Sequence, residues 1–188
     1  IISLYTRRQG IYIAVFPQIM ENEVPYIKIG SGTKNFYANL CRAYLKNHSL
    51  IRVVGGGYKI HAALWIYAKL QKEFYVHDIQ HLCVHYNRMH SMCIFSISKS
   101  PTDVVDIIED NENNIEISEN ETVSHTVYRC KHILKDKSVM HISAVGISSV
   151  KAFFVSSQLA LLGCVSYVYP VKLLQDKVKI KIKVYKPY

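Results

Sequence analysis

The sequence predicts an α/β fold of the α+β sandwich type, made of two small modules with the order β-α-β-α-β-β. Three observations lead to this prediction. Apolar side chains alternate in some segments and recur every three or four residues in others, which are the periods of half-buried strands and amphipathic helices. The same order of segments returns after roughly 90 residues. A length of 188 residues suits one ordinary domain or two small ones.

The charges fall into three blocks. Residues 1–102 carry 12 basic and 4 acidic side chains, residues 103–121 carry 8 acidic and no basic ones, and residues 122–188 carry 11 basic and 2 acidic ones. Two cationic blocks around an acidic connector again indicate two modules, and the net charge of +9 makes a polyanion the first partner to consider. We therefore divide the chain into an N-terminal extension (1–24), module one (25–100), an acidic linker (101–114) and module two (115–188).

The first elements are assigned from alternation and turn residues. Residues 11–16 read as a short strand that Pro17 ends, in an extension packed on module one. Module one itself opens with an alternating strand at 25–30. Thr33 can cap the helix that the apolar spacing predicts over 36–45.

The rest of module one alternates in the same way. A short strand at 51–54 runs into three glycines, which predict a tight turn. A second amphipathic helix extends from Ile60 to about Lys72. Two segments of strand type follow, 76–86 and 92–99, and complete the module as a hairpin.

Module two repeats this order. A brief strand at 115–117 precedes a helix that starts within 119–122, and a strand at 138–142 precedes a helix from Ser148. Gly163 ends that helix. Two further strands, 165–173 and 178–184, form a terminal hairpin around Gln175-Asp176. A duplicated module is the simplest account of both the pattern and the charge.

The last strand carries a row of lysines. Lys177, Lys179, Lys181 and Lys183 alternate with β-branched residues, so a strand places all four lysines on one face. Such a face either protects a sheet edge from pairing or neutralises phosphates without reading sequence.

A glycine-rich junction is the second candidate feature. Gly55-Gly56-Gly57 stand between a strand and a helix, where exposed backbone N–H groups and the helix N-terminus favour anions. Tyr58 and Lys59 add a ring for stacking and a positive charge. The spacing is not that of a dinucleotide fingerprint, and a plain tight turn is the alternative interpretation.

Together with the strand at 26–30, the helix through Leu45 and the strand at 51–54, this junction resembles that of an Alba domain, a nucleic-acid-binding fold of archaeal chromatin and of eukaryotic RNA-binding relatives. The Alba junction has a glycine, a basic or small pair, an isoleucine and a helix start of small residues; Gly57, Lys59, Ile60 and Ala63 match it. In module two, Gly146 and Lys151 look like the same glycine and helix lysine. The resemblance covers about 25–100 and, more weakly, 115–187.

The resemblance implies that the two modules pair within the chain, because Alba domains usually work as dimers. This sequence departs from the family in two loops. Ser31-Gly32 replace the paired lysines that archaeal members carry after the first strand, with Lys34 slightly later, and the matching loop of module two is acidic at Glu119 and Glu121. The C-terminal domain of bacterial translation initiation factor three has a similar element order and is the competing fold.

Catalysis is not expected from this sequence. His77, His81, His85 and Cys83 would share a strand face, but successive side chains on one face stand roughly 6–7 Å apart, so few could meet at one metal ion. A metal-dependent nuclease is the alternative that this strand leaves open. Five cysteines without a CxxC pair favour a reducing intracellular compartment, cytoplasm or nucleus, and no apolar run reaches the roughly 18 residues of a membrane span.

We therefore expect a non-catalytic protein without cofactor or metal that binds nucleic acid, RNA rather than DNA, through its phosphates. The alternative is a scaffold subunit of a larger ribonucleoprotein, similar to the paired Alba-type subunits of ribonuclease P and MRP, with other such subunits as partners. The expected contact residues are Lys28, Lys34, Arg42, Tyr58, Lys59, Arg88, Lys151, Lys177, Lys179, Lys181 and Lys183.

Overall fold

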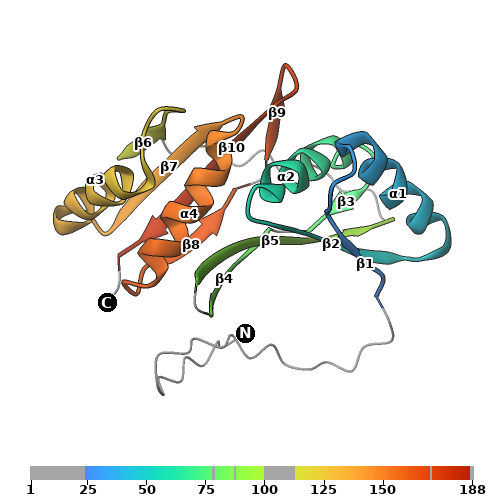
Figure 1. The fold of residues 1–188 in the computed structure, drawn as a ribbon, viewed down its shortest axis with the longest axis horizontal. Helices are drawn as coiled ribbons and strands as arrows, with labels where there is room; N and C mark the ends of the chain where they lie inside the picture. Colours follow the sequence, from blue (N-terminus) through green and yellow to red (C-terminus); the bar gives the residue numbers. More distant parts are fainter. Residues whose placement is uncertain (1–23, 78, 87, 100–112, 170, 187–188) are drawn as a thin grey trace.

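The structure is a computed structural model that describes residues 24–77, 79–86, 88–99, 113–169 and 171–186 (Figure 1). The N-terminal extension before residue 24, with its predicted strand, lies outside the described residues. The acidic linker does too, apart from Asn113 and Asn114. Module two starts one residue earlier than predicted, because Asn114 already belongs to its first strand.

Module one has the predicted helices and strands, with one strand more than predicted. Its elements are β1 (Tyr26–Lys28), α1 (Lys34–Asn47), β2 (Leu50–Gly56), α2 (Lys59–Leu70), β3 (Tyr75–Val76), β4 (Gln80–Tyr86) and β5 (Arg88–Ser98). They form sheet one in the order β1-β2-β5-β3, with β4 also paired to β5. The β1–β2 pair is parallel and the other pairs are antiparallel.

Module two repeats this arrangement element by element. Its elements are β6 (Asn114–Ile117), α3 (Val123–Asp136), β7 (Val139–Val145), α4 (Ser148–Ala160), β8 (Val165–Val168), β9 (Lys172–Leu174) and β10 (Lys177–Tyr185). Sheet two has the order β6-β7-β10-β8, with β9 paired to β10. The fold is therefore mixed α/β, with two sheets of the same topology.

The first helix of each module begins and packs in the same way. Thr33 and Thr122 are the N-caps of α1 and α3, and each hydroxyl accepts a hydrogen bond of 3.2 Å from the backbone N–H three residues on. The four buried residues of α1 lie 89 positions before those of α3: Tyr37, Ala38, Cys41 and Leu45 against Thr126, Val127, Cys130 and Leu134.

The prediction of one continuous strand at 76–86, and of another at 165–173, is wrong. Each is divided into two strands that pair with the same partner. Val76 lies opposite Ile97 and Gln80 opposite Ile94, so four steps along one strand match three along β5. The β8 and β9 register against β10 contains the same extra residue. A residue inserted in this way bends a strand, and hydropathy alternation does not reveal it.

The two modules share a core. One continuous cluster of buried apolar side chains includes residues of both sheets and all four helices within the described part of the chain. The helices of each module lie over one face of its sheet (Figure 1). Across the contact, α2 packs on β9 and β10 of module two, while α4 packs on β4 and β5 of module one. The contact is thus reciprocal.

Two buried or half-buried hydrogen bonds add to this contact. Ser91 Oγ on β5 lies 2.5 Å from Ser157 Oγ on α4, and Gln71 Nε2 at the end of α2 donates to the Val171 carbonyl at 2.9 Å. Because buried polar groups need hydrogen-bond partners, these two bonds favour the relative position of the two modules in which both are formed.

Candidate nucleic-acid interface

The turn before α2 requires a glycine. Gly57 has φ +57° and Gly146, before α4, has φ +65°, which is left-handed backbone that glycine adopts at little cost. Gly55 has a different role, because α2 lies very close to it. A Cβ atom there would stand 2.7 Å from the Lys59 carbonyl oxygen and 2.8 Å from the Ala63 Cβ. The glycine-rich sequence therefore lets the start of α2 pack directly on β2.

The N-terminal ends of α2 and α4 lie against each other. His61 Nδ1 on α2 is 3.4 Å from Ser149 Oγ on α4. Neither N-cap residue, Tyr58 or Ile147, caps its helix through a side-chain hydrogen bond. Because helix N-termini carry partial positive charge, two of them side by side favour an anion. The Tyr58 ring stands out from this point and is 81% exposed.

Two lysines of module one lie beside the Trp65 ring of α2, and one of them, Lys69, stands in the last turn of that helix. Lys34 Nζ lies 5.4 Å from the centroid of the buried Trp65 ring, and Lys69 Nζ lies 5.8 Å from it. Cations at this distance from an aromatic face are attracted to it, which holds their stems in place. Lys59 opens α2 and is half-buried. Lys28 is exposed on β1, an edge of sheet one, and points away from α1 and α2 because its neighbours Ile27 and Ile29 are buried in the core.

The ring of His61 is affected by these neighbours. Burial lowers the pKa of His61 and the positive charge of Lys34 lowers it further, while a hydrogen bond with the backbone of Gly146 opposes them in part. His61 is therefore neutral at neutral pH. Lys34 is therefore close enough to His61 to influence its charge.

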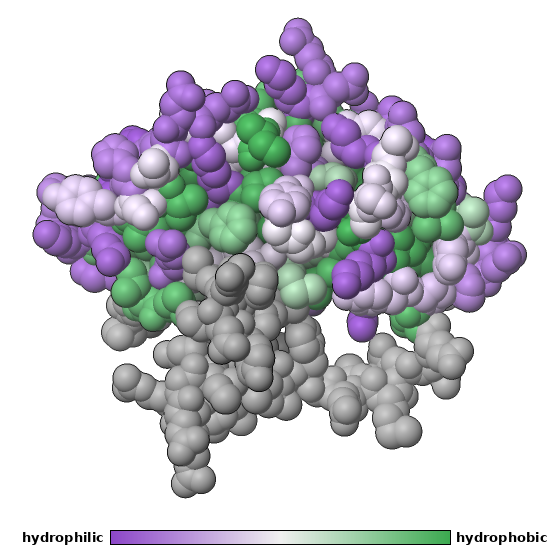
Figure 2. All heavy atoms as spheres, viewed as in Figure 1, coloured by the Kyte–Doolittle hydropathy of each residue, from purple (hydrophilic) through white to green (hydrophobic). Residues whose placement is uncertain are grey.

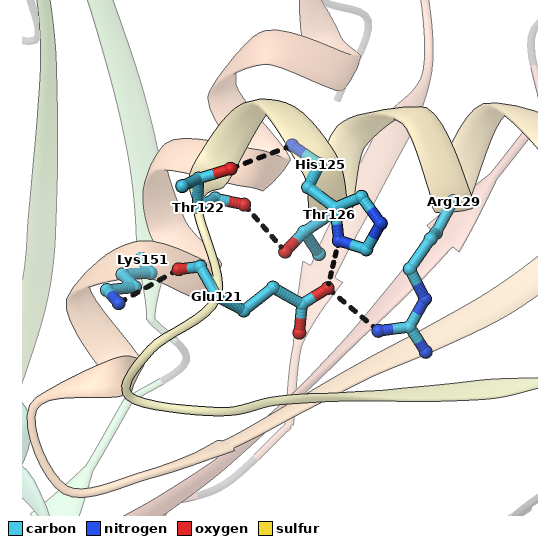
Figure 3. A network of polar contacts seen from close by, with 6 residues as sticks. All are labelled: Glu121, Thr122, His125, Thr126, Arg129 and Lys151. Carbon is cyan, nitrogen blue, oxygen red and sulfur yellow. Dashed lines mark hydrogen bonds and ion pairs between the residues drawn. The ribbon is translucent and has the colours of Figure 1, made fainter.

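The corresponding loop of module two is held by a polar network (Figure 3). The Glu121 carboxylate accepts hydrogen bonds from Arg129 Nη1 at 2.8 Å and from His125 Nδ1 at 3.2 Å. The Thr126 hydroxyl donates to the Thr122 carbonyl at 3.1 Å. Lys151 on α4 donates to the carbonyl of Glu121 at 2.9 Å and also to that of Glu119.

This network changes the charge expected of the loop. Partial burial alone would raise the pKa of Glu121, but hydrogen bonding and charge from Arg129, with the hydrogen bond of His125, lower it overall. Glu121 is thus ionised and paired. Of the two carboxylates that make this loop acidic, that of Glu121 is paired and that of Glu119 is exposed and unpaired among the described residues.

Lys151 does not occupy the place predicted for it. Lys59 and Ser148 each stand two residues after the positive-φ glycine of their module and open the helix. Lys151 is three residues further along α4, so its counterpart in module one is Ala62. It still lies near the contact between the helices, two residues after Ser149.

Arg42 lies away from this cluster. Its guanidinium forms a two-pronged ion pair with Glu73, with N–O distances of 2.8 and 2.6 Å, and a third bond of 2.8 Å to Asn39. Glu73 follows the C-terminal end of α2, whereas Lys59 opens that helix. The hydrogen bonds and charge of Arg42 lower the pKa of Glu73. The side chain of Arg88 lies outside the described part of the structure.

The lysine row of β10 is not one exposed face. Val178, Ile180, Ile182 and Val184 are buried in the core, as the alternation predicts. The lysines therefore point to the face of sheet two turned away from α3 and α4. Lys177 is exposed, Lys179 and Lys183 are half-buried, and Lys181 is only 5% exposed, with its Nζ 6.0 Å from the Tyr169 ring. The row does not continue the surface around Lys34 and Lys59.

Other candidate features add no site. Within the described residues, no three His, Cys, Asp or Glu side chains gather as a metal site would require, and the side chains of His81, Cys83 and His85 lie outside that description. Cys41, Cys93, Cys130 and Cys164 are free and buried, and burial raises the pKa of each thiol. None of the helices among the described residues has both the length and the apolar character needed to cross a membrane.

Comparison with known proteins gives no further assignment: no protein-family model and no curated protein matches this sequence. The site therefore rests on its geometry. Sequence reasoning missed the Trp65 ring between two lysines and the contact of His61 with Ser149. The contacts of Lys34 with Trp65 and of His61 with Ser149 depend on which helices pack together, which the sequence does not show. The i, i+4 spacing of Trp65 and Lys69 is a signal that could have indicated the contact of Lys69 with the ring.

Proposed function

We propose that this chain is a non-catalytic RNA-binding protein, with two Alba-like modules paired within one chain. The proposed interface, the junction surface, consists of Lys34, Tyr58, Lys59 and Lys151. Lys28 is left out, because its neighbours Ile27 and Ile29 are buried in the core and Lys28 therefore lies on the face of sheet one turned away from the helices. The observation that carries the proposal is the contact of two helix N-termini beside Lys34 and the exposed ring of Tyr58. A strand of RNA presents phosphates to such a cationic centre and unpaired bases to such a ring.

The distribution of charge supports module one as the main contact. Lys34 has no carboxylate paired to it among the described residues, whereas Arg129 of module two is paired with Glu121. We leave Arg42 out of the interface because Glu73 already binds it. The β10 lysines are left out because they face away from the helices and Lys181 is buried.

A salt series tests the proposal. The purified chain is titrated into a fluorescent single-stranded RNA, and into DNA of the same sequence, at several salt concentrations. Since phosphate contacts release counterions, we expect an affinity that falls steeply with salt and depends little on sequence, with RNA bound more tightly. Binding that is absent at low salt, or insensitive to salt, would contradict it.

A further inference from the structure

Module two has a pocket at the C-terminal ends of α3 and α4. Its volume is about 360 Å³. Three lysines stand around it, Lys131, Lys135 and Lys186, and leucines form its floor, Leu134, Leu159 and Leu162. We call this the lysine pocket. Figure 2 shows hydrophobic residues exposed beside hydrophilic ones at the lower left, near the end of α4 in Figure 1.

Module one fills the same place with an ion pair. Arg42 and Glu73 lie 89 residues before Lys131 and Leu162, and Lys46 lies 89 before Lys135. The match extends to hydrogen bonding, because Lys99 Nζ donates to the Lys46 carbonyl and Lys186 Nζ to the Lys135 carbonyl, each at 3.1 Å. In module one the Glu73 carboxylate binds Arg42 across this position.

Module two lacks the carboxylate. Leu162 stands where Glu73 does and is 48% exposed, and the residues that line the lysine pocket include no acid. Lys186 donates to the Lys135 carbonyl at the end of α3, as Lys99 donates to the Lys46 carbonyl in module one. Among the described residues, Lys131 therefore lacks the carboxylate that its counterpart Arg42 has. The pocket thus combines lysine charges, with no carboxylate among the described lining residues, and an exposed aliphatic surface.

We propose that the lysine pocket binds an acidic, aliphatic segment of a partner protein. The partner would supply to Lys131 the carboxylate that Glu73 supplies to Arg42, and would lay an aliphatic side chain on the leucines. A protein segment suits the pocket better than a nucleic acid, because none of the described residues that line it offers an aromatic ring for a base to stack on. The pocket lies at the far end of the 13-residue helix α4 from the junction surface, about 20 Å away, so RNA and partner can bind together.

The test uses a fluorescent peptide in which glutamates flank leucines, with two control peptides that carry glutamine for glutamate or serine for leucine. We expect the acidic leucine peptide to bind the full chain with one site per chain, and each control peptide to bind at least about tenfold more weakly. Equal binding of all three peptides, or no binding, would overturn the proposal.

Exchanging the two modules' residues makes the test specific. Lys131→Arg with Leu162→Glu should close the pocket as in module one and abolish peptide binding. Arg42→Lys with Glu73→Leu should open a second pocket and give two sites per chain. Lys137→Glu, on the exposed C-cap of α3 and outside the pocket, is the control for general charge and should leave binding unchanged.

Three results would contradict the proposal. The first is an equal loss of binding with Lys137→Glu. The second is retention of binding after Leu162→Glu in a chain that still folds by circular dichroism. The third is peptide binding that appears only after the acidic residues of 103–112 are neutralised, because the occupant would then be this chain itself. RNA affinity, measured on the same variants, should not change.

Discussion

Module one and module two have the same backbone and different surfaces. Their N-cap threonines, positive-φ glycines and buried helix positions coincide at a spacing of 89 residues. Sheet topology and even the extra residue in the outer strand are repeated. The two modules therefore share the pattern of positions that specifies the fold, although the residue types at equivalent positions can differ.

The surface positions differ in charge at nearly every point of interest. Lys28 on β1 corresponds to Glu116 on β6, since each follows the isoleucine that pairs with the centre of the next strand. Lys34, which reaches Trp65, corresponds to Val123, and Glu73 corresponds to Leu162. A duplicated fold thus lets the two copies present different surfaces; in our proposal module one presents its cations to RNA, while module two packs against it and presents the lysine pocket.

Among matched variants of the two modules, the largest difference in the free energy of unfolding is expected at Gly55 and its counterpart. Its counterpart in module two is Ala144, which is buried with a Cβ atom already present. Gly55→Ala should reduce the free energy of unfolding by about 1–3 kcal/mol, because the new methyl group collides with backbone of α2. Ala144→Gly should cost no more than about 1 kcal/mol. Urea unfolding measures both, and equal costs would mean that α2 and α4 sit at the same distance from their sheets.

Substitutions at the equivalent positions Tyr58 and Ile147 should differ in their effect on RNA affinity. Both are exposed N-caps of adjacent helices, and one of them is aromatic. Tyr58→Ala should weaken single-stranded RNA binding by about 1–3 kcal/mol, the usual value of one stacked base. Ile147→Ala is the matched control and should have little effect. A loss of the same size in both variants would show that the ring does not stack on a base.

His61 makes the contact between modules depend on pH. Its pKa is lowered in the folded chain from an ordinary value of 6.5, so the unfolded chain takes up the proton first. The stability that the neutral ring contributes is complete above that value and is lost as pH falls below it. His61→Gln should flatten the decline of the unfolding free energy between about pH 7 and pH 5. An unchanged slope would assign the decline to other histidines.

The ion pairs should have the smallest effect. Arg42 and Glu73 are about one third and two fifths exposed, and exposed pairs contribute about 0–1 kcal/mol. Arg42→Ala, and Arg129→Ala, which breaks the pair with Glu121 in module two, should each lower thermal stability only slightly. A much larger loss in Arg129→Ala would indicate that the Glu121 network holds the start of α3 in place.

The sequence predicted the order of elements well, because each depends on local pattern. Helix starts at Thr33 and Thr122 follow from hydroxyl capping, and the turn at Gln175-Asp176, where both residues have positive φ, lies where predicted. The strand breaks after Val76 and Val168 were missed. They depend on register against the partner strand, which no single strand's alternation contains.

The candidate site was predicted less well, because it depends on contacts between distant segments. Tyr58 and Lys59 follow the glycine turn directly and Lys34 opens α1, so local pattern was enough to make them candidates, and their role in binding stays a prediction. The pairing of Arg42 with Glu73 joins residues 31 apart, and the burial of Lys181 depends on what packs over the outer face of sheet two. Neither can be read from charge and spacing alone.

The most direct measurement compares charge reversal on the two modules. Lys34→Glu with Lys59→Glu removes two cations of the junction surface, and Lys135→Glu with Lys137→Glu makes the same change in net charge on module two. RNA affinity is measured for both over a salt series. We predict that the first variant binds at least about tenfold more weakly and has a salt dependence reduced by about two counterions, while the second stays close to the unmodified chain. Equal losses in the two variants would contradict the account, since binding would then follow net charge alone.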